Sequence, residues 1–167
     1  MIMNRKYVLT DDCITVDGRR LYRIECVRPF SHMICGMRGG YIEHDGNLSH
    51  DGNAWVAGDA MVMGNAEVID DALVCDNACV RGDALISGKA MVCDNAIVSG
   101  NAMVRDDAEV KDRARVSGNP QVYEKACISG DAQVEGGAMV YGRARVSGKA
   151  RVCGMYAHVH GAAVITD

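Results

Sequence analysis

From Ala54 onwards the chain repeats one six-residue pattern, Ala-x-(Val/Ile)-x followed by two turn-forming residues, through seventeen successive hexads that end at Met155. Ala fills the first position of every hexad except at Pro120, and the third position is always Val or Ile. Residues two apart point to the same side of a β-strand, whereas a helical face needs a spacing of about 3.6. The pattern predicts a short strand in each hexad and excludes helix.

The last two positions of each hexad predict a corner. They hold pairs such as Gly-Asp, Gly-Asn, Asp-Asn and Gly-Lys, which tolerate a left-handed backbone or bond their own main chain. A strand of about four residues cannot bury its apolar face alone, so successive hexads must wind into coils that stack around a common interior. We therefore expect a β-solenoid.

The six-residue period resembles the hexapeptide-repeat superfamily. This resemblance implies an all-β fold, a left-handed parallel β-helix with three hexads in each triangular coil. The hand is implied by the resemblance alone. Residues eighteen apart then occupy the same place on neighbouring coils, about 4.8 Å apart.

The segment before the repeats carries a second resemblance. GGYIEHDGNLSHDGNAWV, from Gly39 to Val56, is similar to the opening of small bacterial and prophage-borne YdcK-like hexapeptide proteins, in which GGYI or GGWV leads into an NLS motif and a Trp. The functions of those proteins are mostly unknown. The resemblance thus implies a fold and, at most, a phage-related accessory role.

Residues 1–41 form a different unit from the solenoid, which we place at residues 42–167. YVLT and ITVDGRRLYRI are typical of strands, with Asp17-Gly18 as a hairpin turn. An open solenoid end exposes strand edges and apolar interior, so we expect this segment to cap the first coil. His44 and His50 stand where Val is usual, and we interpret them as hydrogen-bonded residues near the cap rather than metal ligands.

Composition bears on the location of the protein and on the metals and partners that it can bind. MIMNRKYVLT contains no long apolar run, so we expect a cytoplasmic protein with no membrane partner. None of the eight cysteines forms a CxxC pair, and the CDNAC spacing of Cys75 and Cys79 is weak for a metal, so we predict free thiols and no metal site. Residues 54–104 hold two basic and seven acidic side chains, which argues against direct nucleic-acid binding.

The first three coils are apolar on their outer surface as well as inside. The eighteen-residue spacing aligns Trp55, Leu73 and Met91 in one column, with Cys75 and Cys93 in the next, and adds Met61 and Ile97 on a second face. Contiguous apolar surface of this kind marks an interaction site. We predict a homo-oligomer, most often a trimer in this superfamily; the alternative is that the N-terminal cap folds over one of these faces.

The later coils carry polar columns. Arg105, Tyr123 and Tyr141 are eighteen apart, and His160 continues this column after a one-residue shift near Met155-Tyr156. Such a line could stack a ring and hold a phosphate. Arg115, Gln133 and Arg151 form a second column that could hold an anion. The alternatives are ordinary solvated repeats or an oligomer interface rich in Tyr and Arg.

Acyltransferase activity is a further alternative, because many hexapeptide-repeat proteins place a catalytic His beside a loop and bind coenzyme A between subunits. The resemblance would then assign His158 or His160 as base and Arg145 or Arg151 to the phosphates. However, no residue is inserted into the frame from Ala54 to Val152.

We therefore predict a non-catalytic solenoid without a resident cofactor. It would sequester a small anionic or nucleotide ligand or mask a host protein. A purely assembly-forming role is the third possibility.

Overall fold

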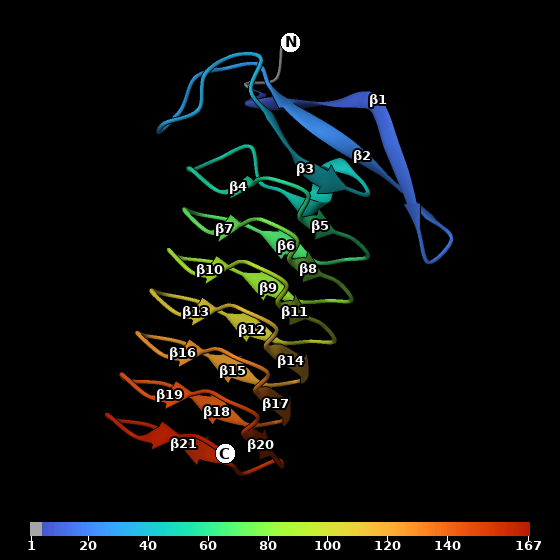
Figure 1. Ribbon diagram of the computed structural model, residues 1–167. Coiled ribbons are helices and arrows are strands. Elements are labelled where there is room, and N and C mark those ends of the chain that lie inside the picture. The colour runs from blue at the N-terminus through green and yellow to red at the C-terminus, as the bar shows by residue number, and fades with distance from the viewer. Residues whose placement is uncertain (1–4) are drawn as a thin grey trace.

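The computed structural model describes residues 5–167, and every regular element except one short 3-10 helix, η1 (Asp45–Asn47), is a β-strand. Three parallel sheets form a β-solenoid, with an antiparallel unit at its N-terminal end (Figure 1). The predicted all-β solenoid with an N-terminal cap is therefore confirmed. Within residues 5–167 there is no helix long and apolar enough to cross a membrane.

Each sheet forms one face of the solenoid. We number the faces in the order in which the chain reaches them from Ala54 onwards. The first face contains β4 (Trp55–Val56), β7 (Leu73–Val74), β10 (Met91–Val92), β13 (Glu109–Val110), β16 (Cys127–Ile128), β19 (Arg145–Val146) and β22 (Val164–Ile165). The second face contains β5 (Met61–Val62), β8 (Cys79–Val80), β11 (Ile97–Val98), β14 (Arg115–Gly118), β17 (Gln133–Gly136) and β20 (Arg151–Cys153). The third face contains β6 (Glu67–Val68), β9 (Leu85–Ile86), β12 (Met103–Val104), β15 (Gln121–Val122), β18 (Met139–Val140) and β21 (His158–Val159).

Neighbouring coils pair in an eighteen-residue register. Met91 pairs with Glu109 on the first face, and main-chain bonds such as Ala57 N–H to the Val74 oxygen (2.8 Å) run from each coil to the next. The register lengthens by one residue near the C-terminus, where Met139 pairs with His158. The extra residue lies in the bend that precedes β21, so the sheets continue beyond it, as the sequence predicted.

The repeated Ala and Val or Ile side chains fill the interior, where nearly all of them have no exposed surface. The fifth residue of each hexad turns the corner with a positive φ, as at Gly58 (64°) and Asp94 (58°). This backbone costs an Asp side chain energy, but the carboxylate compensates by accepting a main-chain N–H from the next coil, as from Asp112 N to Asp94 (3.1 Å).

Pro120 replaces Ala at a corner that does not use the missing N–H. At the other two corners of a coil, the Ala N–H bonds to the oxygen three residues earlier, as in Ala114 to Lys111 (3.2 Å). Among the described residues, the equivalents of Pro120 on other coils (Ala66, Ala84, Ala102 and Ala138) make no such bond. Proline is tolerated where its absent donor leaves nothing unsatisfied.

The cap consists of β1 (Tyr7–Val16), β2 (Arg19–Cys26) and β3 (Arg38–Ile42), with the predicted turn at Asp17 and Gly18, both at positive φ. β3 pairs antiparallel with β2 and parallel with β5, so one strand joins the cap to the first coil. A Cβ atom on Gly39 or Gly40 would lie 2.5 Å from a main-chain oxygen of that coil, which explains the glycine pair of the GGYI motif.

Polar side chains complete the junction. The buried Asn47 donates from Nδ2 to the oxygens of Gly64 and Ala66 (both 2.9 Å), which gives the NLS motif a structural role. His44 accepts from Gly46 N (3.1 Å), and His50 stacks on Tyr7 with ring centroids 4.2 Å apart. Both histidines therefore make contacts within the cap region, as expected.

Candidate functional site

Four side chains on the third face form one continuous stack. The Arg105 guanidinium lies 4.3 Å from the ring centroid of Tyr123, and the Tyr123 and Tyr141 rings stack with centroids 5.0 Å apart at an interplanar angle of 4°. His160 continues the stack, 5.3 Å from Tyr141. The structure thus brings together the column predicted from the eighteen-residue spacing, including the residue beyond the one-residue shift.

The sheet register creates this stack. Tyr123 N–H donates to the oxygen of Val140 (3.0 Å), and Tyr141 N–H donates to that of Val159 (2.9 Å), so the backbone fixes the spacing of the rings. Strands about 4.8 Å apart are close to the preferred separation of stacked aromatic rings. Burial, and next the neighbouring Tyr141, raise the pKa of the Tyr123 hydroxyl. This hydroxyl therefore remains a hydrogen-bond donor at neutral pH.

Stacking also restricts what this surface can bind. Both faces of each tyrosine ring are occupied by neighbours in the column, so a nucleobase has no free ring face to cover between Arg105 and His160. The ring edges, the hydroxyls and the far side of His160 remain available. The arrangement is suited to edge and hydrogen-bond contacts rather than to insertion of a ring.

The second predicted column lies on the second face. Arg115 pairs in register with Gln133, and Gln133 pairs with Arg151. Arg151 is already engaged by Glu135, with 3.0 Å between Nη2 and the carboxylate oxygen. An anion on this column would compete with that carboxylate for Arg151, which leaves Arg115 as the exposed cation of the column.

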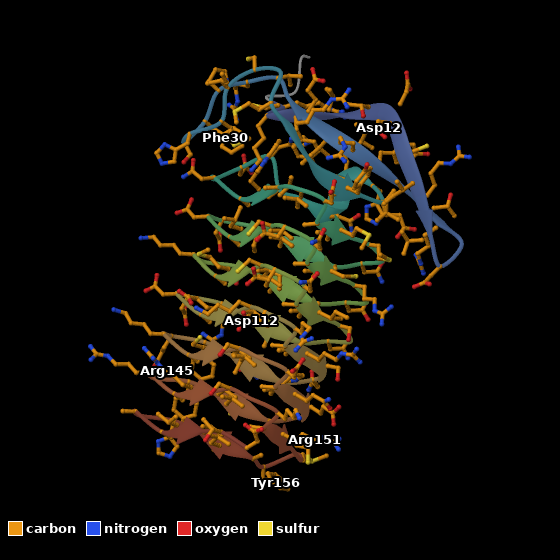
Figure 2. All side chains as sticks on the ribbon, in the orientation of Figure 1. Asp12, Phe30, Asp112, Arg145, Arg151 and Tyr156 are labelled. Atoms are coloured by element: carbon orange, nitrogen blue, oxygen red, sulfur yellow. The ribbon has the colours of Figure 1, made fainter. Side chains whose placement is uncertain are left out.

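The residues named for acyl transfer do not converge within one chain. His158 and His160 lie on the third face. Arg145 lies on the first face and Arg151 on the second. Figure 2 shows Arg145 and Arg151 on opposite sides of the solenoid. His158 instead lies edge-on to Tyr141, with centroids 6.3 Å apart. A site that combined these groups would need a second subunit.

A groove of about 770 Å³ on the first face was not predicted. Lys125 and Arg145 contribute positive charge to it, whereas its Lys111 is paired with Glu109 (3.0 Å). Applying the eighteen-residue register to the first face could have revealed it, because its lining repeats from coil to coil. The lining residues are Asp107, Glu109, Lys111, Lys125, Cys127, Ser129, Arg145, Ser147 and Val164.

One residue predicted for an oligomer interface is instead buried within the chain, and a second is partly covered. Trp55 is only 4% exposed, because Phe30 of the cap covers it with ring centroids 5.4 Å apart. Met61 is partly buried against the cluster that Leu21 of the hairpin forms with Met63. The expectation that Trp55 lies on an open surface is corrected by this covering, which is the alternative that the sequence left open.

The other predicted interface residues, like Met61, keep part of their surface. Met91 is 37% exposed, and Leu73 and Ile97 are partly exposed. Leu73 and Met91 line a groove of about 630 Å³ between the first face and the cap segment that carries Phe30. Whether a second subunit contacts these residues stays a prediction.

The sequence comparisons agree with this geometry. Residues 138–154 match the family model described as YdcK Beta solenoid repeat. A search of curated proteins finds no significant match.

The stacked coils and the match define the class of this protein as a hexad-repeat β-solenoid. More specifically, it carries a YdcK beta-solenoid repeat, in agreement with the resemblance to YdcK-like proteins seen in the GGYI, NLS and Trp motifs.

Proposed function

We propose that this β-solenoid acts by binding and not by catalysis, and that it binds a protein through the third face. The observation that carries this proposal is the continuous stack of Arg105, Tyr123, Tyr141 and His160. Arg and Tyr are enriched in the energetically important centres of protein interfaces. Small-molecule sites are concave, whereas this stack stands on an open sheet face.

The stack is also rigid before binding. Its members are held at fixed spacing by the main-chain bonds between coils, so little conformational entropy is lost when a partner binds. The partner would be either a second copy of this chain or a different protein, such as a host protein that is masked. A homo-oligomer, with a trimer as the expected number, remains part of this proposal.

Native mass spectrometry on gently purified protein from the producing cells tests the proposal. We expect the parent chain to appear in a complex. The mass of this complex should be either a multiple of the mass of the chain or the sum of its mass and that of another protein. Tyr141→Ala should lose this mass. Gln133→Ala, on the second face, should retain it. A parent that is monomeric and alone, or equal behaviour of the two variants, would overturn the proposal.

The groove on the first face favours a second candidate function, capture of a small anionic or nucleotide ligand. Lys125 and Arg145 there would meet a phosphate, and the groove is concave as such sites usually are. Thermal shift with nucleotides and coenzyme A tests it. Stabilisation should be lost in Arg145→Ala and kept in Arg115→Ala, and no shift in the parent would reject it.

The acyltransferase alternative predicts turnover of acetyl-coenzyme A. The same preparations measure it directly, with His158→Ala and His160→Ala as the variants expected to abolish it. Absence of turnover with a panel of hydroxyl and amine acceptors, together with protein mass in the native spectrum, is the outcome expected from the binding function.

A further inference from the structure

Two cysteines of the first face lie side by side on neighbouring coils. Cys75 follows β7 and Cys93 follows β10, at the same position of their hexads. Cys75 N–H donates to the Val92 oxygen (2.9 Å), so the main chain holds the two coils in register at this point. The two thiols therefore form a pair that is fixed by the sheet.

A carboxylate completes the cluster. The sulfur atoms of Cys75 and Cys93 and a carboxylate oxygen of Asp76 all lie within 4.8 Å of one another. Asp76 sits at a corner with a φ of 59°, and its Oδ2 accepts the N–H of Asp94 (3.2 Å). This bond keeps the carboxylate beside the thiols.

The spacing is close to that of a small metal site. A tetrahedral zinc ion with Zn–S bonds of about 2.3 Å requires its two sulfur ligands to be about 3.8 Å apart. The three donor atoms lie within 4.8 Å of one another, so binding would require only a small approach of the side chains. Because the backbone needs no rearrangement, the coil stack supplies a preformed site.

The donor set selects the type of ion. Two thiolates and one carboxylate suit a borderline or soft cation such as Zn²⁺, whereas Ca²⁺ and Mg²⁺ prefer oxygen ligands alone. Three protein ligands leave the fourth tetrahedral position for water or for a group supplied by another molecule.

We propose that Cys75, Asp76 and Cys93 form a zinc-binding site on the first face. The prediction of no metal site considered the CDNAC spacing of Cys75 and Cys79, which lie in successive hexads, whereas the structure pairs Cys75 with Cys93 of the next coil. The site is separate from the third-face stack, so it does not rest on the proposed binding function.

Binding exchanges protons for the ion. Burial raises the pKa of the Cys75 thiol to about 12 and raises that of Cys93 as well, so both thiols carry protons when no ion is bound. Zn²⁺ displaces one proton from each sulfur as the two Zn–S bonds form, and the protons pass to the buffer. Asp76 contributes a carboxylate oxygen as the third ligand.

Cadmium titration of the untagged, fully reduced chain tests the site, because cadmium thiolates absorb in the ultraviolet and zinc then competes for the same ligands. We expect saturation at one ion per chain, reversal of the band by Zn²⁺ and release of protons. Cys75→Ser and Cys93→Ser should each lose the band. Asp76→Asn should weaken binding by about tenfold or more.

The control is Cys127→Ser, which removes a partly buried thiol of the same face. Cys127 lies two coils beyond Cys93 and in a different column. It should bind cadmium as the parent does, and circular dichroism should show that all variants remain folded. Absence of saturable binding in the parent, or an equal loss in Cys127→Ser and Cys93→Ser, would overturn the proposal.

Discussion

The two ends of the solenoid are built differently from the same repeat. At the N-terminal end, Lys6 and Tyr7 are completely buried and bond to the first coil, through Lys6 Nζ to the Ala54 oxygen (2.7 Å) and the Tyr7 hydroxyl to the Leu48 oxygen (2.7 Å). At the C-terminal end, Tyr156 and Val164 are 85% and 65% exposed. Figure 2 shows Tyr156 at the tip of the last coils, far from the cap that carries Phe30.

This difference teaches that the repeat propagates the fold but does not close it. A hexad leaves main-chain groups and interior side chains for the next coil to cover. The cap covers them with non-repetitive sequence, in which side chains of Lys6 and Tyr7 reach carbonyl groups that a further coil would otherwise bond. We therefore expect equivalent substitutions to cost more at the capped end than at the open end.

The largest expected effect comes from a charge in the interior. Val62→Asp, in the first coil below the cap, should destabilise the fold by about 4 kcal/mol or more, because the carboxylate has no partner in the narrow core. Val152→Asp should cost about half as much, since the last coils can separate from the rest.

Urea unfolding followed by circular dichroism measures both variants. Lys149→Asp, at an exposed corner, is the control and should change the free energy of unfolding by less than about 0.5 kcal/mol. Equal losses for the two valine variants would show that the whole solenoid unfolds as one unit and would remove the distinction between its ends.

Truncation of an isoleucine gives a matched comparison. Ile24 is fully buried in the cap, whereas Ile165 in β22 is only partly buried. Ile24→Ala should cost about 3 kcal/mol and Ile165→Ala about 1 kcal/mol, because the cost follows the buried volume that is lost. Thermal unfolding by calorimetry checks the order; a larger loss at Ile165 would contradict it.

Removal of one hydroxyl tests the polar closure of the first coil. Tyr7→Phe should cost about 1–2 kcal/mol, because the buried Leu48 oxygen loses a donor. Tyr156→Phe, at the open end, should leave stability unchanged. If both substitutions are neutral, the cap acts through apolar contacts alone.

The last comparison concerns pH. Burial lowers the pKa of Lys6 from 10.5 to about 8, so between these values the unfolded chain holds a proton that the folded chain has released. Lys6 therefore makes the free energy of unfolding increase as pH rises through that range. Lys6→Met lacks this titration, so the free energy of unfolding of the parent should rise relative to that of the variant between about pH 8 and about pH 10.5.

Comparing parent and variant at each pH is essential, because buried thiols act in the opposite direction. The raised pKa of Cys75 and Cys79 lowers the free energy of unfolding above about pH 9, where the unfolded thiols ionise first. These contributions are common to parent and variant and cancel. A difference that does not change with pH would contradict the assignment to Lys6.

The solenoid itself was predictable because its information is local and repeated. The Ala and Val spacing defines the interior, the fifth residue of each hexad defines the corner, and the eighteen-residue register predicted the stack from Arg105 to His160. The register also placed Cys75 and Cys93 in one column. The hand of the coil, which came from the resemblance, stays a prediction.

The contacts of the cap were not predictable in the same way. Trp55 is buried because residues near Phe30 fold back over it, and that segment has no periodicity from which its path follows. The position of Asp76 beside the two thiols was likewise not predicted, and it lies at a corner with a left-handed backbone. Departures from the repeat had to be seen in three dimensions.

The hydrogen bonds between coils have a mechanical consequence. They run along the solenoid axis, and β1 and the C-terminus lie at opposite ends of it (Figure 1). A force that pulls on these two ends loads the bonds of one coil boundary at a time, so coils should peel away in sequence rather than resist together. We expect the extension curve to be a staircase of similar low-force steps that begins at the C-terminal coils, where Tyr156 and Val164 are exposed.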